Sequence, residues 1–149
     1  MQNRIVRSPV FQEYNAEKQF EVNTGHEVSL NYENFGMQEV LKEALPQGVE
    51  IPGGFETIGT IVHLNLSDTQ MPYRKIIGEV IKDKNPSINT VVAKIGQIQT
   101  TFRFYDLICV AGDDSTYETI HVEDKVRFKV DISRVYWCSK LSTERTRLI

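Results

Sequence analysis

Alternating apolar and polar residues mark the last strand of the chain. Val126, Phe128, Val130 and Ile132 are apolar, and the residues between them are charged. This period of two predicts a β-strand over residues 125–132 with one face in the core. Similar runs predict strands at 55–66, 89–95, 103–112 and 117–124. We expect the 117–124 strand to pair antiparallel with the last strand across Glu123 and Asp124.

Helical spacing appears in two places. The clearer helix is predicted over residues 72–84, with Pro72 in its first turn. Its apolar stripe consists of Tyr73, Ile76, Ile77, Val80 and Ile81. A second helix is predicted over residues 34–45, with Asn34 as its cap. Because the helix at 72–84 lies between the strands at 55–66 and 89–95, a right-handed crossover would pair those two strands in parallel.

The order of these elements predicts an α+β fold. We expect a mixed β-sheet with a strand-helix-strand unit and one main covering helix. Residues 20–32 alternate about Gly25, which predicts two further strands around a turn. A segment rich in Pro and Gly at 46–54 then divides a small N-terminal α/β piece, residues 1–50, from a main domain, residues 51–149.

Composition excludes several classes of protein. The chain has 149 residues, 40% of them hydrophobic and 25% charged, as in an ordinary globular domain. It contains neither an apolar run long enough for a membrane helix nor a signal-peptide core at its start, so we expect a cytoplasmic protein, with the nucleus or mitochondrion as further compartments. Cys109 and Cys138 form no CxxC pair, and the three histidines are scattered, so no metal site is predicted.

Charge is distributed unevenly along the chain. The net charge is −3, which argues against a uniformly basic nucleic-acid binder. Nine glutamates lie between residues 13 and 56, whereas the segment from Lys125 onward carries seven cations against Asp131 and Glu144. A charge run is usually a solvated face, but this positive excess coincides with aromatic residues.

The candidate site follows the last strand. It consists of Tyr136, Trp137, Lys140, Glu144 and Arg145. Aromatic faces stack on bases, cations bind phosphates, and a positioned carboxylate can move a proton, so this mixture suits a nucleobase. A simpler interpretation is that the aromatics close the core and that Glu144 is a surface charge in the first turn of a helix.

Several segments together resemble the tRNA (guanine-N1) methyltransferase that acts at position 37, in its eukaryotic and archaeal form. The most specific is DISRVYWCSKLSTER at residues 131–145. The others are residues 55–66, 73–84, 90–96, 102–104 and 110–114. The resemblance covers residues 50–149 and implies the middle domain of that enzyme.

The resemblance implies a role for each candidate residue. Glu144 would remove the proton from N1 of a flipped guanine, and Arg103 would steady charge on O6. Tyr136 would position the base, and Arg145 would touch the donor, S-adenosylmethionine. Lys140 stands where the family usually has arginine, so its role is weaker. Trp137 is assigned to the core.

The resemblance also implies residues that this chain lacks. The family holds the donor in a doubly wound domain with a glycine-rich loop, and no such loop with strand-helix context occurs here. We therefore expect an N-terminal and middle-domain fragment that binds tRNA as a monomer, lacks its C-terminal methyltransferase domain and is inactive alone. Two alternatives remain open: a fragment of the wybutosine-pathway aminocarboxypropyl transferase, and an RNA-binding module without chemistry.

Overall fold

A computed structural model of the chain describes residues 27–96 and 106–148. The chain divides into two compact units, residues 1–31 and 32–149, and the architecture below is that of the second. Its helical elements are η1 (Tyr32–Asn34), α2 (Met37–Ala44), η2 (Met71–Tyr73), α3 (Arg74–Lys84), η3 (Ser139–Leu141) and α4 (Ser142–Arg147). Its strands are β1 (Glu56–Ile58), β2 (Ile61–Leu64), β3 (Thr90–Ile95), β4 (Asp106–Gly112), β5 (Glu118–Glu123) and β6 (Val126–Asp131). The predicted α+β class is confirmed.

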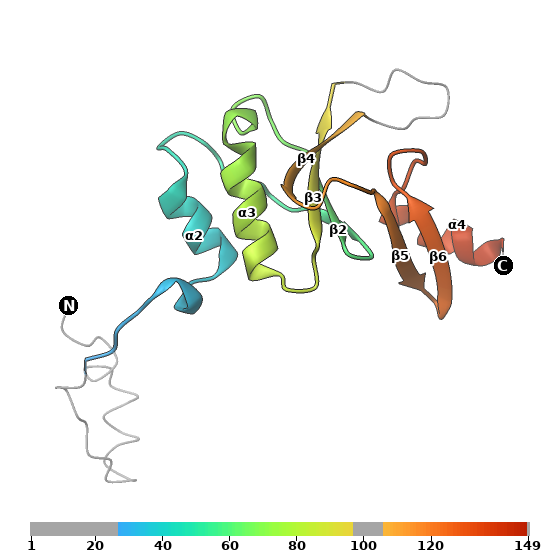
Figure 1. Cartoon of the computed structure of the whole chain (residues 1–149), viewed down its shortest axis with the longest axis horizontal. Coiled ribbons are helices and arrows are strands. Elements are labelled where there is room, and N and C mark those ends of the chain that lie inside the picture. The colour runs from blue at the N-terminus through green and yellow to red at the C-terminus, as the bar shows by residue number, and fades with distance from the viewer. Residues whose placement is uncertain (1–26, 97–105, 149) are drawn as a thin grey trace, which may run out of the picture. The chain divides into compact units, whose positions relative to one another are not determined.

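Four strands form the main sheet in the order β1-β2-β3-β4. β1 and β2 are antiparallel, β2 and β3 are parallel, and β3 and β4 are antiparallel. The parallel pair is joined by α3, which confirms the predicted strand-helix-strand unit (Figure 1).

The single strand predicted at 55–66 is wrong, because the segment forms a hairpin. Ile58 pairs with Ile61, and the turn between them contains Gly59 with φ +56°. This left-handed conformation is readily adopted by glycine, so the chain reverses there instead of continuing as one strand.

Helices α2 and α3 cover one face of the main sheet. Their shared core is formed by Leu41, Leu45, Val62, Leu64, Ile77, Val80, Ile81, Ile88, Val91, Ala93, Val110 and Ala111. The predicted α3 stripe is confirmed except at Ile76, which is 42% exposed because it lies at the margin of the stripe. The predicted cap at Asn34 is also wrong: Asn34 ends η1, and the N-cap of α2 is Gly36, whose N–H donates to Glu39 Oε2 at 2.7 Å.

Strands β5 and β6 form a separate antiparallel hairpin, as predicted. Glu123 pairs with Val126 across Asp124 and Lys125, whose φ values of 47° and 68° are those of a tight two-residue turn. The predicted alternation along β6 is confirmed, with Val130 buried and Arg127 and Lys129 exposed.

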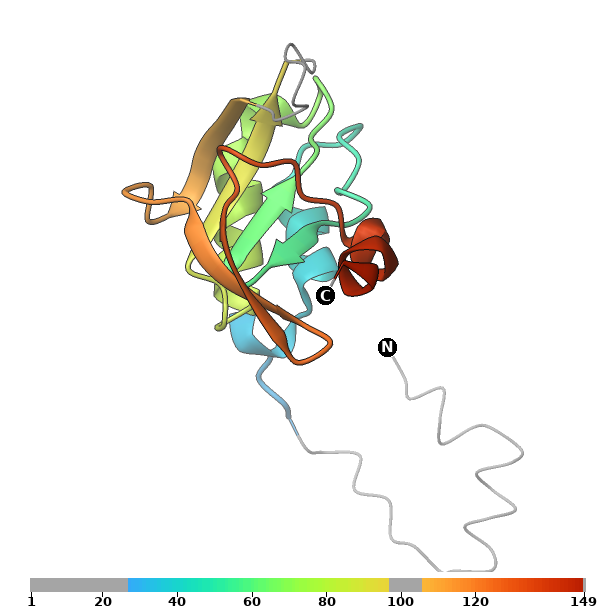
Figure 2. The same ribbon diagram turned by 90° about the vertical axis from the view of Figure 1, so that its right-hand side faces the viewer.

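A second core joins this hairpin to the main sheet. It consists of Ile58, Ile61, Val92, Val130 and Ile132, with Leu107, Tyr117, Phe128 and Trp137 packed against it. Because Val91 and Val92 are neighbours on β3 and point to opposite faces, this core lies on the face away from α2 and α3 (Figure 2).

The N-terminal predictions fare less well. Residues 27–31 form no strand, and Val28 and Leu30 are exposed, so the second of the two strands predicted at 20–32 is wrong; the first lies outside the described residues. A strand needs a partner that covers its apolar face, and alternation alone does not supply one. The domain boundary predicted at residue 50 stays a prediction. Among the described residues, no helix is long and apolar enough to cross a membrane.

Candidate functional site

The candidate residues lie on the segment that follows β6. Asp131 ends the strand with an Asx turn, because its Oδ1 accepts hydrogen bonds from the N–H and hydroxyl of Ser133 at 3.0 and 2.6 Å. The chain then passes Tyr136 and Trp137 and enters η3 and α4. Ser142 begins α4 and Glu144 lies in its first turn, which confirms the helix that Ser-Thr-Glu predicts.

A shallow depression of about 460 Å³ brings several of these residues together. It is lined by Lys129, Val130, Asp131, Val135, Tyr136, Trp137, Leu141, Glu144, Arg145 and Leu148. Tyr136, Glu144 and Arg145 therefore border the same space. Lys140 lies on η3, exposed, outside this lining.

Glu144 and Tyr136 are accessible. The Glu144 side chain is 58% exposed, and its Oε2 lies 2.8 Å from a guanidinium nitrogen of Arg147, one turn along α4. A surface pair of this kind is weak and leaves the carboxylate open to solvent and ligand. Tyr136 is exposed as well.

Arg145 is held differently. Its Nε and Nη2 donate to the two carboxylate oxygens of Glu123 at 2.6 and 2.8 Å, and Nη1 donates to the carbonyl of Cys138 at 2.9 Å. Its guanidinium carbon lies 4.0 Å from the centre of the Trp137 ring. Such a forked, stacked contact is specific to arginine.

The electrostatics of this pair are consistent from both sides. Hydrogen bonding from Arg145 holds the pKa of Glu123 below its usual range. The hydrogen bond to Glu123 raises the pKa of Arg145. Both groups therefore remain charged at neutral pH.

Trp137 belongs to the interior, as predicted. Its ring packs edge-on against the rings of His121 and Phe128, with distances between ring centres of 4.9 and 6.0 Å. These contacts lie on the side of the second core. Arg145 stacks on the same ring. The tryptophan thus links the hairpin core to α4.

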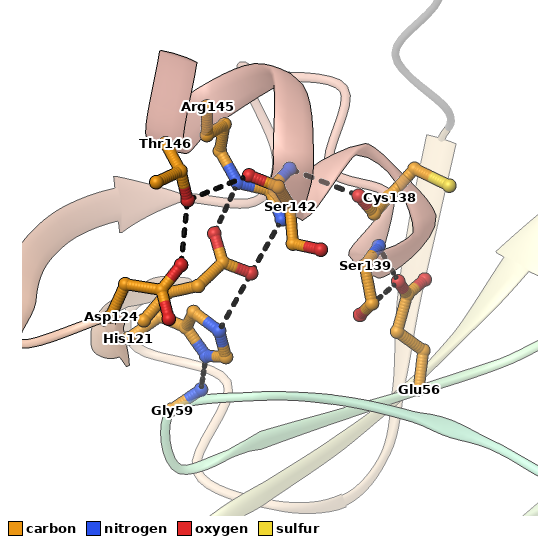
Figure 3. A network of polar contacts seen from close by, with 10 residues as sticks. Glu56, Gly59, His121, Asp124, Cys138, Ser139, Ser142, Arg145 and Thr146 are labelled. Atoms are coloured by element: carbon orange, nitrogen blue, oxygen red, sulfur yellow. Dashed lines mark hydrogen bonds and ion pairs between the residues drawn. The ribbon is translucent and has the colours of Figure 1, made fainter. Parts of the chain in front are cut away.

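Carboxylates that the sequence analysis did not select surround this segment (Figure 3). Glu56 on β1 accepts hydrogen bonds from the N–H and hydroxyl of Ser139 at 2.5 and 2.6 Å. Asp124 accepts one from the Thr146 hydroxyl at 2.6 Å. The sequence contains no signal for Glu123, because it alternates with the apolar residues Ile120 and Val122. In the structure those two residues are exposed, and Glu123 shares the less exposed face of β5 with Thr119 and His121.

Two predicted features are not tested by this geometry. Arg103 lies outside the described residues, so its place relative to Glu144 stays a prediction. The donor contact of Arg145 also stays a prediction, and in the structure all three guanidinium nitrogens are already engaged. Among residues 27–96 and 106–148, no group of three His, Cys, Asp or Glu side chains could hold a metal ion.

Comparison with known proteins gives the family. A family model described as the TYW2 N-terminal domain matches residues 37–116, more than half of the chain. Relatives named tRNA (guanine(37)-N(1))-methyltransferase include those of Xenopus tropicalis, 42% identical over 135 residues, and Encephalitozoon cuniculi, 48% identical over 122 residues. These alignments cover 89% and 82% of this chain but only 27% and 33% of the relatives.

Solved structures agree with these sequence relatives. A complex of aTrm5 and tRNALeu matches 92% of this chain and 43% of its own with a TM-score of 0.69 and 26% identity. Trm5b of Pyrococcus abyssi matches 65% of this chain and 29% of its own with a TM-score of 0.55 and 34% identity. The predicted resemblance is confirmed: the chain belongs to the TYW2 N-terminal domain family, and the relatives that it matches over most of its length are tRNA (guanine(37)-N(1))-methyltransferases.

Proposed function

We propose that this chain is the base-handling part of a tRNA methyltransferase that transfers a methyl group from S-adenosylmethionine to N1 of guanosine 37. The observation that carries this proposal is the 42–48% identity to tRNA (guanine(37)-N(1))-methyltransferases over 82–89% of the chain. The geometry supports it, because an aromatic side chain and an accessible carboxylate border one depression.

The chemistry requires a base. N1 of guanine carries a proton at neutral pH, so a methyl group can be accepted there only as that proton leaves. Glu144 is the candidate, since its carboxylate is accessible and borders the depression beside Tyr136. Arg103 would steady the charge that develops on O6, a role supported by the resemblance alone.

The proposed partner is tRNA. A base that leaves the anticodon loop can stack on an aromatic side chain, and Tyr136 is exposed at the depression. Lys140 and Arg147 are exposed and lie close to Tyr136 and Glu144 in the sequence, so their side chains could contact phosphates. A structural relative was solved in complex with tRNALeu, which is consistent with this partner.

The donor would supply the methyl group, but the described residues do not fit a donor site. Arg145, the candidate contact, already gives its guanidinium nitrogens to Glu123 and Cys138. The alignments cover only 20–33% of the relatives, so the relatives are much longer than this chain. We therefore place donor binding outside these 149 residues and expect no methyl transfer by the chain alone.

A second candidate comes from the family description. The matching model is that of the TYW2 N-terminal domain, and TYW2 of P. horikoshii in complex with MeSAdo matches 75% of this chain and 38% of its own, with a TM-score of 0.57 and 25% identity. This supports the aminocarboxypropyl transferase alternative. The higher identity to the methyltransferases favours methyl transfer.

One experiment separates these functions. The chain is joined to the donor-binding part of the Xenopus tropicalis relative and supplied with S-adenosylmethionine and tRNA that carries guanosine, adenosine or a modified base of the wybutosine pathway at position 37. We expect N1-methylguanosine only with guanosine, detected by mass spectrometry of the digested tRNA. A heavier adduct on a modified base would favour the second candidate, and tRNA binding without any product would favour an RNA-binding module.

A further inference from the structure

The α4 helix has little apolar attachment to the rest of the molecule. It is six residues long, and no residue of η3 or α4 is buried. A helix this short is unstable by itself, so its position depends on the contacts made by its side chains. Those contacts decide where Glu144 stands.

The strongest of these contacts is the pair between Arg145 and Glu123. The two side chains are only 17% and 15% exposed, and two parallel hydrogen bonds join them. The pair links α4 to the last residue of β5, and Arg145 also binds the Cys138 carbonyl at the entrance to η3. A shielded fork of this kind fixes orientation as well as distance.

Weaker links flank this pair. Glu56 holds Ser139 at the start of η3, and Asp124 holds Thr146 in α4, both through exposed hydrogen bonds (Figure 3). Behind Glu123, His121 Nδ1 accepts a hydrogen bond from the Gly59 N–H at 3.2 Å, which ties β5 to the main sheet. These contacts connect α4 to β5 and, through β5, to the main sheet.

We propose that Glu123 is a positioning residue for the base-handling site, acting through Arg145. Successive residues of an α-helix point about 100° apart, so fixing Arg145 against β5 also fixes the direction of Glu144. Glu144 is thereby held at the depression together with Tyr136. The inference rests on the proposed function, since it assigns Glu123 to the presentation of the catalytic base.

The first test uses the 149-residue chain itself. Glu123→Gln removes the charge and one half of the fork, and Glu118→Gln is the matched control, since Glu118 lies on the same strand in an exposed pair with Lys129. Hydrogen exchange is followed in peptides that cover 139–148. We expect about tenfold faster exchange there in Glu123→Gln, with α3 and β3 unchanged and the control like the wild type.

Trp137 gives an independent reading of the same contact. It is the single tryptophan of the chain, and Arg145 stacks on it. Tryptophan emission should therefore change in Glu123→Gln and not in Glu118→Gln. Unchanged emission together with wild-type exchange in α4 would overturn the inference.

The second test separates positioning from general stability. In the joined methyltransferase described above, Glu123→Gln should lower kcat about tenfold and leave the KM for tRNA nearly unchanged. The reason is that a misplaced Glu144 carboxylate slows the removal of the proton but does not change tRNA binding. Glu123→Asp, which keeps the charge, should recover part of the loss. If Glu144→Gln is impaired but Glu123→Gln is fully active, the positioning role is wrong. If Glu144→Gln is itself fully active, the base role in the proposed function fails instead.

Discussion

A side chain at Gly59 would collide with Thr119. A β-carbon built on Gly59 would overlap Oγ1 of Thr119 and lie 2.5 Å from the Ile120 carbonyl oxygen. The same Thr119 hydroxyl accepts a hydrogen bond from the Thr60 N–H at 3.0 Å. The β1–β2 turn therefore touches β5 directly, and the close approach requires glycine.

Gly59→Ala should destabilise the protein by about 2 kcal/mol or more. The left-handed conformation and the backbone collision both oppose a β-carbon at this position. Chemical denaturation measures the change. Gly54→Ala is the control, since a β-carbon there meets nothing within 4 Å and Gly54 has no positive φ, so its free energy of unfolding should stay nearly unchanged.

His63 should make stability depend on pH. Its side chain is 10% exposed, and burial, with a smaller effect of Lys94, lowers its pKa from 6.5 to about 4. Because the unfolded chain binds this proton below pH 6.5 and the folded chain does not, the free energy of unfolding should fall as pH drops from 6.5 to 4. The loss amounts to about 3 kcal/mol.

Denaturation of the wild type and His63→Gln across this pH range isolates the effect from other titrating groups. Between pH 6.5 and 4 the free energy of unfolding of the wild type should fall more steeply than that of the variant, since the variant lacks the proton-linked loss. Parallel curves for the two proteins would show that His63 titrates normally in the folded state.

The local elements were predictable from sequence because the relevant signals are local. The alternation in 125–132 and the helical stripe of 72–84 depend only on which residues face the core. The split at Gly59 was missed because a hairpin turn and a weakened strand look alike until the partner Thr119 is known. The strand predicted around Val28 failed because alternation does not supply a neighbouring strand.

The site was partly predictable for a similar reason. Tyr136, Glu144 and Arg145 are close in sequence, so an aromatic and charged cluster could be recognised before the fold was known. Glu123, the partner of Arg145, is 22 residues away on strand β5, and only the fold brings the two side chains together. Charge composition alone could not tell an arginine that holds the structure from one that awaits a ligand.

Binding of tRNA by the 149-residue chain should depend steeply on salt. The exposed cations near α4 would replace counterions on phosphates. Lys140→Gln should weaken binding and reduce the slope of log K against log salt by about one, measured by filter binding. Lys75→Gln, an exposed lysine on α3, is the control and should change neither quantity. Binding that does not respond to salt would favour a protein partner.

The most direct test of the account is the rate of N1 methylation after Glu144→Gln in the joined methyltransferase. Glutamine keeps the shape of the side chain and cannot take the proton, so the rate should fall about a hundredfold or more while tRNA affinity is retained. Glu118→Gln, an exposed carboxylate on β5, should methylate like the wild type. A Glu144→Gln enzyme that methylates guanosine 37 at the wild-type rate would contradict the proposal that this carboxylate removes the proton.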